Sequence, residues 1–522
     1  MTAEALEHTG PVETQFGKVQ GTRAGGVSAF LGIPFGGDTK ASRFKPAPAP
    51  KAWTGLRECF AFGAMAPQGM IHMSNRPGAA ANTDFLRTVA AILRAGTAAP
   101  GPESEDCLFL NVYTPQASAA QKRPVMVWLH GGAFAMGSGG NSGYDGSALC
   151  RRGDVVVVTI NHRLNALGYL YLGALHDDFA DSGNVGQLDI VQALNWVRDN
   201  IEAFGGDPRN VTIFGESGGG AKVSTLLAMP AAKGLFHKAI VQSGPAVTLV
   251  DKTDAEEIAD RTLAALGVTK ADVHTLLTLD CKAIIEAASA VRLPGAGLTR
   301  RALAPVVDGR SLPAHPFEPS APDVSRDIPL MIGTNKDEAT LFFMADPDFG
   351  KMTAEQVRQR FKADLGPKGD AAFEIYRARR PDDQPTYWGT ALGTDLMFRN
   401  DSIRMAERKA ARRAAPAFMY RLDWEPPMLD GILRSTHGLD IPLMFDNPGT
   451  APRLVGTGPE PKKIAAVMAQ AWVNFARTGD PSQDALAWPP YEETQRRTMI
   501  FDVNSRVVSD PDGDVRAFWN NA

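Results

Sequence analysis

The stretch NVTIFGESGGG, residues 210–220, decides the fold that the sequence predicts. Its first residues are apolar and β-branched, which indicates a strand, and its glycines lead into a helical pattern, GGAKVSTLLAM. Between them lies a G-x-S-x-G motif that holds Ser217 on a sharp turn from strand to helix. Side chains at the flanking positions would collide with neighbouring backbone, which explains the glycines. We therefore expect the hydroxyl to stand at the C-terminal edge of a sheet, above a helix N-terminus that favours developing negative charge.

Further apolar runs recur along the chain, with amphipathic segments between them. The runs lie at residues 124–130, 154–163, 210–215, 237–244, 328–335 and 417–424. Runs that are apolar on both faces are typical of interior strands of a parallel sheet. The segment 187–206 traces one apolar helical face before two glycines end it. This alternation predicts a doubly wound α/β fold with a mostly parallel sheet, and we expect residues 1–522 to form a single catalytic domain.

Two regions interrupt this alternation. Residues 69–104 are rich in Gly, Pro and Ala, and residues 345–415 have mostly helical patterns without a convincing strand. Long excursions on an α/β core usually form lids or binding loops. We expect these two segments to be helical lid or gorge insertions that govern the choice of substrate.

The composition is that of an ordinary globular protein, with 44% hydrophobic and 21% charged residues among 522. Lys and Arg number 54 against 58 Asp and Glu, and this net charge of −4 indicates no nucleic-acid partner. Basic residues cluster in 404–413, but Glu407 and alanines interleave with them, so we expect a solvated helix face. No run reaches the roughly 18 apolar residues of a membrane-spanning helix, so we expect no membrane partner.

The N-terminal residues and the cysteines bear on the compartment. Residues 1–21 contain no basic start followed by an apolar run, so we expect no secretory signal. The four cysteines are few and widely spaced, which favours reduced thiols in a cytoplasmic protein: Cys59, Cys107, Cys150 and Cys281. A secreted mature form stays open.

Catalysis by a serine needs an oxyanion hole, and one follows the strand at 124–130. The sequence His130-Gly-Gly-Ala-Phe is an HGG-type loop whose backbone N–H groups can face the serine. We expect the oxyanion-hole donors to be Gly132, Ala133 and Gly218. His130 itself is expected to be structural.

The serine also needs a base and an acid that orients it. Of nine histidines, His437 in RSTHGLDIPLMF fits the order serine, acid, histidine. His162 and His237 flank strands and are expected to be packed or partly exposed. The others occupy loop or surface settings without a motif: His8, His72, His176, His274 and His315.

For the acid, IGTNKDEATLFF offers both Asp337 and Glu338, and the physics of the sequence does not choose between them. Asp308 is a third candidate, but Asp-Gly after an apolar run more often forms a turn. The chain contains no H-E-x-x-H, no zinc-spaced Cys/His set and no phosphate-binding G-x-x-x-x-G-K-[ST] loop. We therefore expect no metal and no organic cofactor.

With these residues assembled, the chain resembles the type-B carboxylesterase family, the cholinesterase-like branch of the α/β-hydrolases, and in particular its bacterial p-nitrobenzyl-esterase-like members. The resemblance covers nearly the whole chain. It rests on SEDCLFLNVYTP (104–115), FGGDPRNVTIFGESGGG (204–220) and WVNFARTGDPS (472–482).

The resemblance implies roles for individual residues. It assigns the acid to Glu338, with Ala339 in place of the family's usual glycine, and the base to His437. It also implies that Glu216 is a buried active-site carboxylate and that Ser243 hydrogen-bonds near the triad. Two internal salt bridges are implied as well: Arg43 with Glu105, and Arg163 with Asp189.

Two departures from the family pattern concern Cys107 and the segment 69–104. Cys107 matches one half of a family disulfide, but Ala66 stands at the partner position, and whether Cys59 pairs instead is left open. The segment 69–104 lacks the tryptophan that holds choline's ammonium in cholinesterases, which argues against a choline ester.

The implied activity is hydrolysis of small to medium organic esters through an acyl-enzyme, by a monomer or homodimer whose partner is a small-molecule ester. Carbamate or amide hydrolysis with the same triad is an alternative reading, and a non-catalytic binding protein is a second. All three triad residues are present, which disfavours the second alternative.

Overall fold

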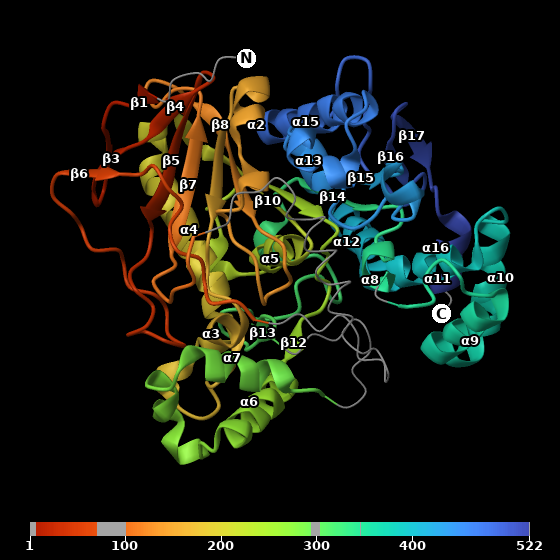
Figure 1. Ribbon diagram of the computed structural model, residues 1–522, viewed down its shortest axis with the longest axis horizontal. Helices are drawn as coiled ribbons and strands as arrows, with labels where there is room; N and C mark the ends of the chain where they lie inside the picture. Colours follow the sequence, from red (N-terminus) through yellow and green to blue (C-terminus); the bar gives the residue numbers. More distant parts are fainter. Residues whose placement is uncertain (1–6, 70–100, 294–302, 345, 521–522) are drawn as a thin grey trace.

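The computed structural model describes residues 7–69, 101–293, 303–344 and 346–520. Its centre is a twelve-stranded sheet with the order β1-β4-β5-β7-β9-β8-β10-β11-β14-β15-β16-β17 (Figure 1). Seven neighbouring strands run parallel: β9 (Val156–Ile160), β8 (Arg123–Leu129), β10 (Gly206–Glu216), β11 (Lys238–Gln242), β14 (Leu330–Asn335), β15 (Ala417–Leu422) and β16 (Arg497–Phe501). All six apolar runs identified in the sequence are therefore strands of the parallel part.

Antiparallel strands extend both edges of the sheet. They are β1 (Glu7–His8), β4 (Thr22–Ala24), β5 (Val27–Pro34) and β7 (Phe109–Thr114) on one side and β17 (Arg506–Ser509) on the other. Two small sheets accompany the large one: β2 (Val12–Thr14), β3 (Gly17–Gln20) and β6 (Leu56–Glu58), and β12 (Val250–Asp251) with β13 (Val306–Val307). None of these edge and small-sheet strands was predicted from the sequence.

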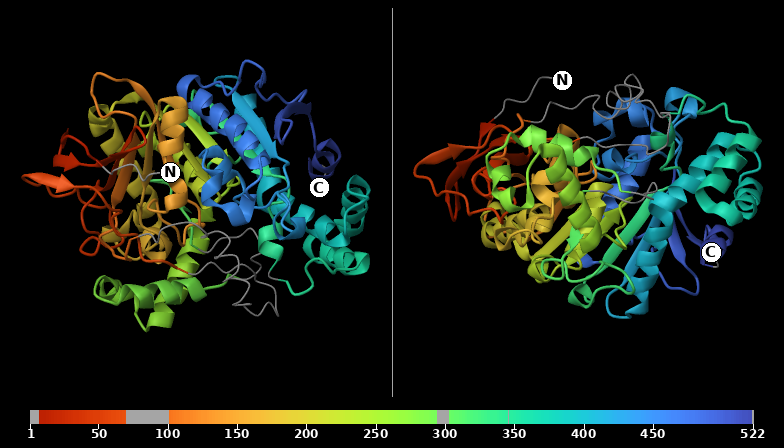
Figure 2. Two further views of the ribbon diagram at one scale, coloured as in Figure 1. Left: turned by 45° about the horizontal axis from the view of Figure 1, so that its top comes forward. Right: turned by 90° about the horizontal axis from the view of Figure 1, so that it is seen from below.

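Helices cover both faces of the sheet (Figure 2). In β8, Val125, Val127 and Leu129 join one core, while Met126 and Trp128 join the other, as the two-residue period of a strand requires. The first core contains residues of α4 (Val185–Asn200), α5 (Gly218–Leu226) and α12 (Asn400–Ala411). The second contains residues of α2 (Ser147–Gly153), α13 (Asp440–Met444) and α15 (Glu460–Thr478). The doubly wound architecture is thereby confirmed.

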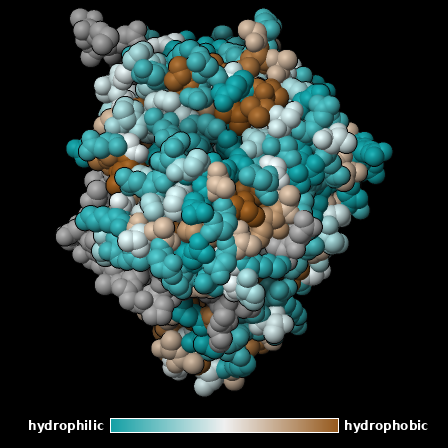
Figure 3. All heavy atoms as spheres, turned by 90° about the vertical axis from the view of Figure 1, so that its right-hand side faces the viewer, coloured by the Kyte–Doolittle hydropathy of each residue, from teal (hydrophilic) through white to brown (hydrophobic). Residues whose placement is uncertain are grey.

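Two helical groups lie outside the layers that cover the sheet, one below the sheet and one at its lower right in Figure 1. One contains α6 (Lys252–Leu266), η6 (Lys270–Leu277) and α7 (Cys281–Ala290), which pack with α3 (Asn165–Tyr169). The other contains α9 (Ala354–Leu365), α10 (Gly369–Arg379) and α11 (Pro385–Thr394), which pack with α16 (Gly513–Asn520). The face on the side of α9 and α10 is mostly hydrophilic, with a few apolar patches (Figure 3).

Of the two predicted insertions, the structure describes one and leaves most of the other outside its described residues. The described elements within 345–415 are all helical, as predicted. The segment 69–104 lies almost wholly outside the described residues. The sequence analysis did not single out the helical group at residues 252–290.

Both implied salt bridges are present and buried. Arg43 and Glu105 approach to 2.5 Å, and Arg163 and Asp189 to 2.6 Å. All four cysteines are free, so Cys59 and Cys107 do not pair. None of the described helices combines the length and apolar character needed to cross a bilayer.

The basic segment 404–413 forms most of α12, as predicted, but its face is only partly solvated. Arg404 contacts Asp401 at 2.8 Å and Arg408 contacts Glu318 at 2.7 Å. Lys409 is buried and donates to the carbonyls of two residues outside the helix. The expectation of a solvated face was therefore wrong for Lys409, because its ammonium is satisfied by backbone oxygens.

Candidate active site

Ser217 occupies the turn between β10 and α5, with φ 57° and ψ −122°. This positive φ is strained for a residue with a side chain, and strain of this kind is concentrated at functional sites. The backbone N–H of Ser217 donates to the carbonyl of Gln242 at 2.9 Å, which ties the turn to β11. Ser217 is half-buried and follows directly on the C-terminal end of β10, at the carboxyl edge of the parallel strands.

The glycines around Ser217 are required by close backbone approach. A Cβ at Gly219 would lie 1.9 Å from the carbonyl oxygen of Leu129, and one at Gly218 would lie 2.1 Å from that of Ala133. No side chain fits at such distances, so the steric reason that we inferred for the glycines holds.

The same contacts place the HGG loop against the serine turn. A Cβ built on Gly131 would lie 3.5 Å from the Cβ of Ser217. Gly132 and Ala133 both have positive φ, at 88° and 53°, and the carbonyl of Gly132 accepts the N–H of Ala135 and of Met136. The loop is thus folded back on itself, and the three expected oxyanion-hole residues, Gly132, Ala133 and Gly218, lie side by side.

His437 and Glu338 meet behind the serine turn. The Nδ1–H of His437 donates to Oε2 of Glu338 at 2.6 Å, and Glu338 is fully buried. The other carboxylate oxygen of Glu338, Oε1, accepts the N–H of Asn335 at 2.6 Å. The acid is therefore held at both oxygens, and it fixes the tautomer in which Nε2 of His437 is free to accept a proton.

The other two acid candidates point elsewhere. Asp337 pairs with Arg380 at 2.5 Å, and Asp308 accepts the N–H groups of Arg310 and Leu312 as an Asp-Gly turn does. Of Asp337 and Glu338, which the sequence alone left open as the acid, only Glu338 contacts His437.

Glu216 faces the other side of the imidazole. Its Oε1 lies 3.2 Å from Nε2 of His437, as an ion pair rather than an aligned hydrogen bond. Among the described residues no hydrogen bond joins Ser217 to His437. The buried carboxylate implied at position 216 is present, only 4% exposed.

Burial and charge oppose each other at His437. Burial lowers the pKa of His437, but the charges of Glu216 and Glu338 and the hydrogen bond to Glu338 outweigh it and raise the pKa to about 9. Burial raises the pKa of Glu216 to about 8; the positive charge of His437 opposes this rise, and the charges of Asp440 and Glu338 add to it. The protonated imidazolium form of His437 is thus stabilised by its surroundings.

The remaining histidines stand apart from this constellation. His130 and His162 are buried and stacked at 4.8 Å, and burial lowers the pKa of both well below its ordinary value. His237 is half-buried and accepts the N–H of Val211. His130 is therefore structural, as expected, and His72 lies outside the described residues.

The hydrogen bond implied for Ser243 is not present. Ser243 is fully buried at φ 47°, and its hydroxyl has no partner among the described residues. Only its backbone is engaged, donating to Gly333 at 2.9 Å.

A family model for the carboxylesterase family matches residues 8–519. The chain belongs to the carboxylesterase family. It is 36% identical to para-nitrobenzyl esterase of Bacillus subtilis (strain 168), covering 97% of each chain, and 32% identical to phenmedipham hydrolase of Pseudarthrobacter oxydans, covering 95% and 96%. The crystal structure of the Geobacillus stearothermophilus carboxylesterase EST55 superposes with a TM-score of 0.82 at 37% identity, covering 98% of this chain and 99% of that one.

This enzyme is accordingly a serine carboxylesterase with the α/β-hydrolase fold, a hydrolase of ester bonds.

Several residues that support the site were not predicted from the sequence. Asn335 donates its side-chain amide to the carbonyl of Thr436, next to His437, and Gln242 donates to the buried Asp440 at 2.7 Å. A polar residue at the end of an apolar strand was the available signal for both.

Two aromatic rings, which we call the aromatic wall, also pack against the imidazole of His437, and the sequence did not predict them. The ring of Phe398 stacks on that of His437 at 4.8 Å, and the ring of Phe342 tilts against it at 5.0 Å. These contacts come from different helical segments, so no local sequence pattern links them.

Proposed function

We propose that Ser217 is the nucleophile, His437 the general base and Glu338 the acid of this carboxylesterase, acting on small to medium organic esters. The observation that carries this assignment is the position of His437. Its Nδ1 is bound to Glu338, while its Nε2 lies beside Glu216, the residue next to Ser217. The imidazole thus stands between the buried acid and the strained serine turn.

The first half of the reaction forms the acyl-enzyme. The Ser217 oxygen attacks the ester carbonyl carbon as its proton passes to Nε2 of His437. Nε2 must turn from Glu216 toward Ser217 for this step, and catalytic hydrogen bonds often tighten only when substrate is bound. The tetrahedral oxyanion is held by the N–H groups of Gly132, Ala133 and Gly218. The C–O bond to the alcohol then breaks, and the alcohol leaves with the proton from His437.

The second half releases the acid. Water gives a proton to His437 Nε2 and attacks the acyl carbon, the bond to Ser217 breaks, and the serine recovers its proton. Throughout, Glu338 holds the imidazole and offsets its positive charge. Glu216, at 3.2 Å from Nε2, adds to that stabilisation.

Hydrolysis of a p-nitrophenyl ester series from acetate to dodecanoate tests this assignment. We expect turnover by the wild type, and losses in kcat of several orders of magnitude, roughly 10⁴ or more, in Ser217→Ala and in His437→Ala. The chain-length optimum reports the size of the acyl pocket. Activity that survives either substitution contradicts the assignment.

Residues 1–522 are proposed to act as one catalytic unit, a monomer or homodimer in the cytoplasm. The four free cysteines support a reducing compartment. Light scattering of the purified chain tests the oligomeric state, and a mass above that of a dimer would contradict it.

A further inference from the structure

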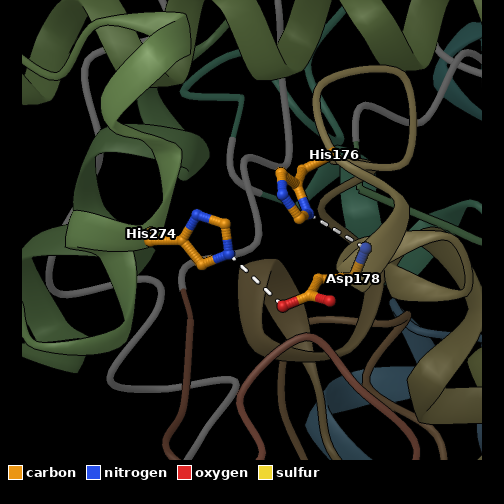
Figure 4. A group of neighbouring side chains, drawn as sticks. All are labelled: His176, Asp178 and His274. Atoms are coloured by element: carbon orange, nitrogen blue, oxygen red, sulfur yellow. Dashed lines mark hydrogen bonds and ion pairs between the residues drawn. The ribbon is translucent and has the colours of Figure 1, made fainter.

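Three side chains outside the active site converge on the protein surface: His176, Asp178 and His274. His176 and Asp178 belong to the short turn at η2 (Asp177–Phe179), and His274 comes from η6 in the helical group at residues 252–290 (Figure 4). One nitrogen or oxygen of each lies within 4.8 Å of the other two. His274 Nε2 is 3.4 Å from Oδ2 of Asp178. All three are exposed, so an ion can reach them from solvent.

A buried aromatic ring, that of Phe179, packs against both histidines of the cluster. Phe179 is fully buried, and its ring lies 5.0 Å from that of His274 and 6.2 Å from that of His176. The two imidazoles contact each other at 4.5 Å, nearly perpendicular. Both imidazole rings therefore pack on the same buried side chain. This packing limits their rotamers before an ion binds, so binding costs less side-chain entropy.

A cation already occupies part of this cluster. The ammonium of Lys45 donates to Oδ2 of Asp178 at 2.8 Å and lies 5.5 Å from the centre of the Phe179 ring. The Asp178 carboxylate is thus shared between Lys45 and His274. An added cation at Oδ2 must compete with the Lys45 ammonium for this carboxylate.

We propose that His176, Asp178 and His274 form a surface binding site for a divalent transition-metal ion of the zinc type. Two imidazole nitrogens and one carboxylate oxygen are ligands that Zn²⁺ and its neighbours in the transition series bind well. Mg²⁺ and Ca²⁺ prefer all-oxygen sites, so this donor set disfavours them. With three protein ligands, water completes the coordination.

Binding rearranges two contacts. Nδ1 of His176 accepts the N–H of Asp178 at 3.1 Å, and a neutral imidazole has only one nitrogen with a free lone pair. A metal at Nε2 therefore requires this bond to open, and a metal at Oδ2 of Asp178 weakens the contact with Lys45. Both changes occur at exposed groups, so we infer a reversible, exchangeable site rather than a permanent one.

The ion would join two segments that are distant in sequence. It would link η6, between α6 and α7, to the turn that follows α3. In the same helical group, the carbonyls of Leu276 and Leu279 already accept hydrogen bonds from Arg43. The metal would thus add a further link between this group and the α/β core, and we expect it to change thermal stability rather than ester hydrolysis.

Isothermal titration of the full chain with ZnCl₂, after EDTA treatment and desalting, tests the proposal. We expect one Zn²⁺ per chain in the wild type and affinity lower by about tenfold or more in His176→Ala and in His274→Ala. Lys45→Met removes the competing ammonium and should bind Zn²⁺ more tightly. Zn²⁺ should raise the unfolding temperature of the wild type but not of His274→Ala.

Two matched controls separate this site from other surface donors. His315→Ala removes another His–Asp pair, the partly buried His315 with the exposed Asp251 at 3.3 Å, and Cys281→Ser removes a partly exposed thiol. Neither should change the affinity. The proposal is overturned if wild type shows no stoichiometric binding, if His176→Ala and His274→Ala bind as wild type does, or if binding is lost with Cys281 or His315 instead. Circular dichroism checks that each variant is folded.

Discussion

Arg380 forms an ion pair of 2.5 Å with Asp337, a fully buried carboxylate that is the immediate neighbour of Glu338, the proposed catalytic acid. Arg380 also lies 3.6 Å from Asp383, which in turn contacts Arg434 at 2.7 Å. Arg434 stands three residues before His437. A chain of four charges therefore connects the loop of the acid to the loop of the base, through the corner between α10 and α11.

Arg380→Met should destabilise the fold strongly, because it leaves the charge of Asp337 buried and unpaired. The pKa of Asp337 is held below its ordinary value against burial by Arg380 and its neighbours. Removing one partner of a buried pair costs about 3–5 kcal/mol in the free energy of unfolding, measurable by urea denaturation.

The control for this change is Arg377→Met in the last turn of α10, whose ion pair with Glu374 is half-exposed. Arg377→Met should lower the free energy of unfolding by less than about 1 kcal/mol. Adding Asp337→Asn to Arg380→Met should recover part of the loss. Equal costs for Arg380→Met and Arg377→Met would contradict a role for the buried network.

Glu216→Gln should move the acid limb of the pH–rate profile to lower pH. Catalysis needs His437 neutral, so activity rises as pH passes upward through its pKa, which neighbouring carboxylates raise to about 9. Removing the charge beside Nε2 disfavours the imidazolium and lowers that pKa, by about one unit or more. The measurement is kcat/KM on p-nitrophenyl acetate from pH 5 to 10.

Asp440→Asn serves as the comparison, since Asp440 is the weakest of the acidic influences on His437 and contacts Gln242 instead. The acid limb of the pH–rate profile should shift less in Asp440→Asn than in Glu216→Gln. A profile unchanged in Glu216→Gln, or a shift to higher pH, would show that Glu216 does not stabilise the imidazolium.

Gly218→Ala should impair the oxyanion hole. The added Cβ would lie 2.1 Å from the carbonyl oxygen of Ala133, so the HGG loop must move away from the serine turn. Misplacing one donor costs about 10²–10³ in kcat. Gly389→Ala is the matched control, because its Cβ would meet only Val357 at 3.6 Å within α11. That variant should keep wild-type kcat, and equal losses in the two would refute the steric argument.

Phe398→Leu should lower kcat by about tenfold while leaving KM within a few-fold of wild type, because the flat ring that orients the imidazole is replaced by a rounded side chain. Phe361→Leu makes the same exchange in the distant core of α9 and α10. It should lower the unfolding temperature without lowering kcat. If both variants keep full kcat, the aromatic wall does not position His437.

The sequence by itself determined the parts of this protein that depend on local pattern. The six apolar runs predicted the parallel strands, and the glycines around Ser217 predicted the tight turn, because periodicity and backbone crowding act between near neighbours in the chain. The HGG loop and His437 followed from motif and order.

Only the tertiary structure decided which side chains meet. Asp337 and Glu338 are adjacent and chemically alike, but successive residues point in different directions, so one contacts Arg380 and the other His437. His176 and His274 carry no motif, and they become neighbours only because η6 packs over the turn at η2. Contacts between distant segments depend on how whole elements pack, and no local pattern in the sequence records that.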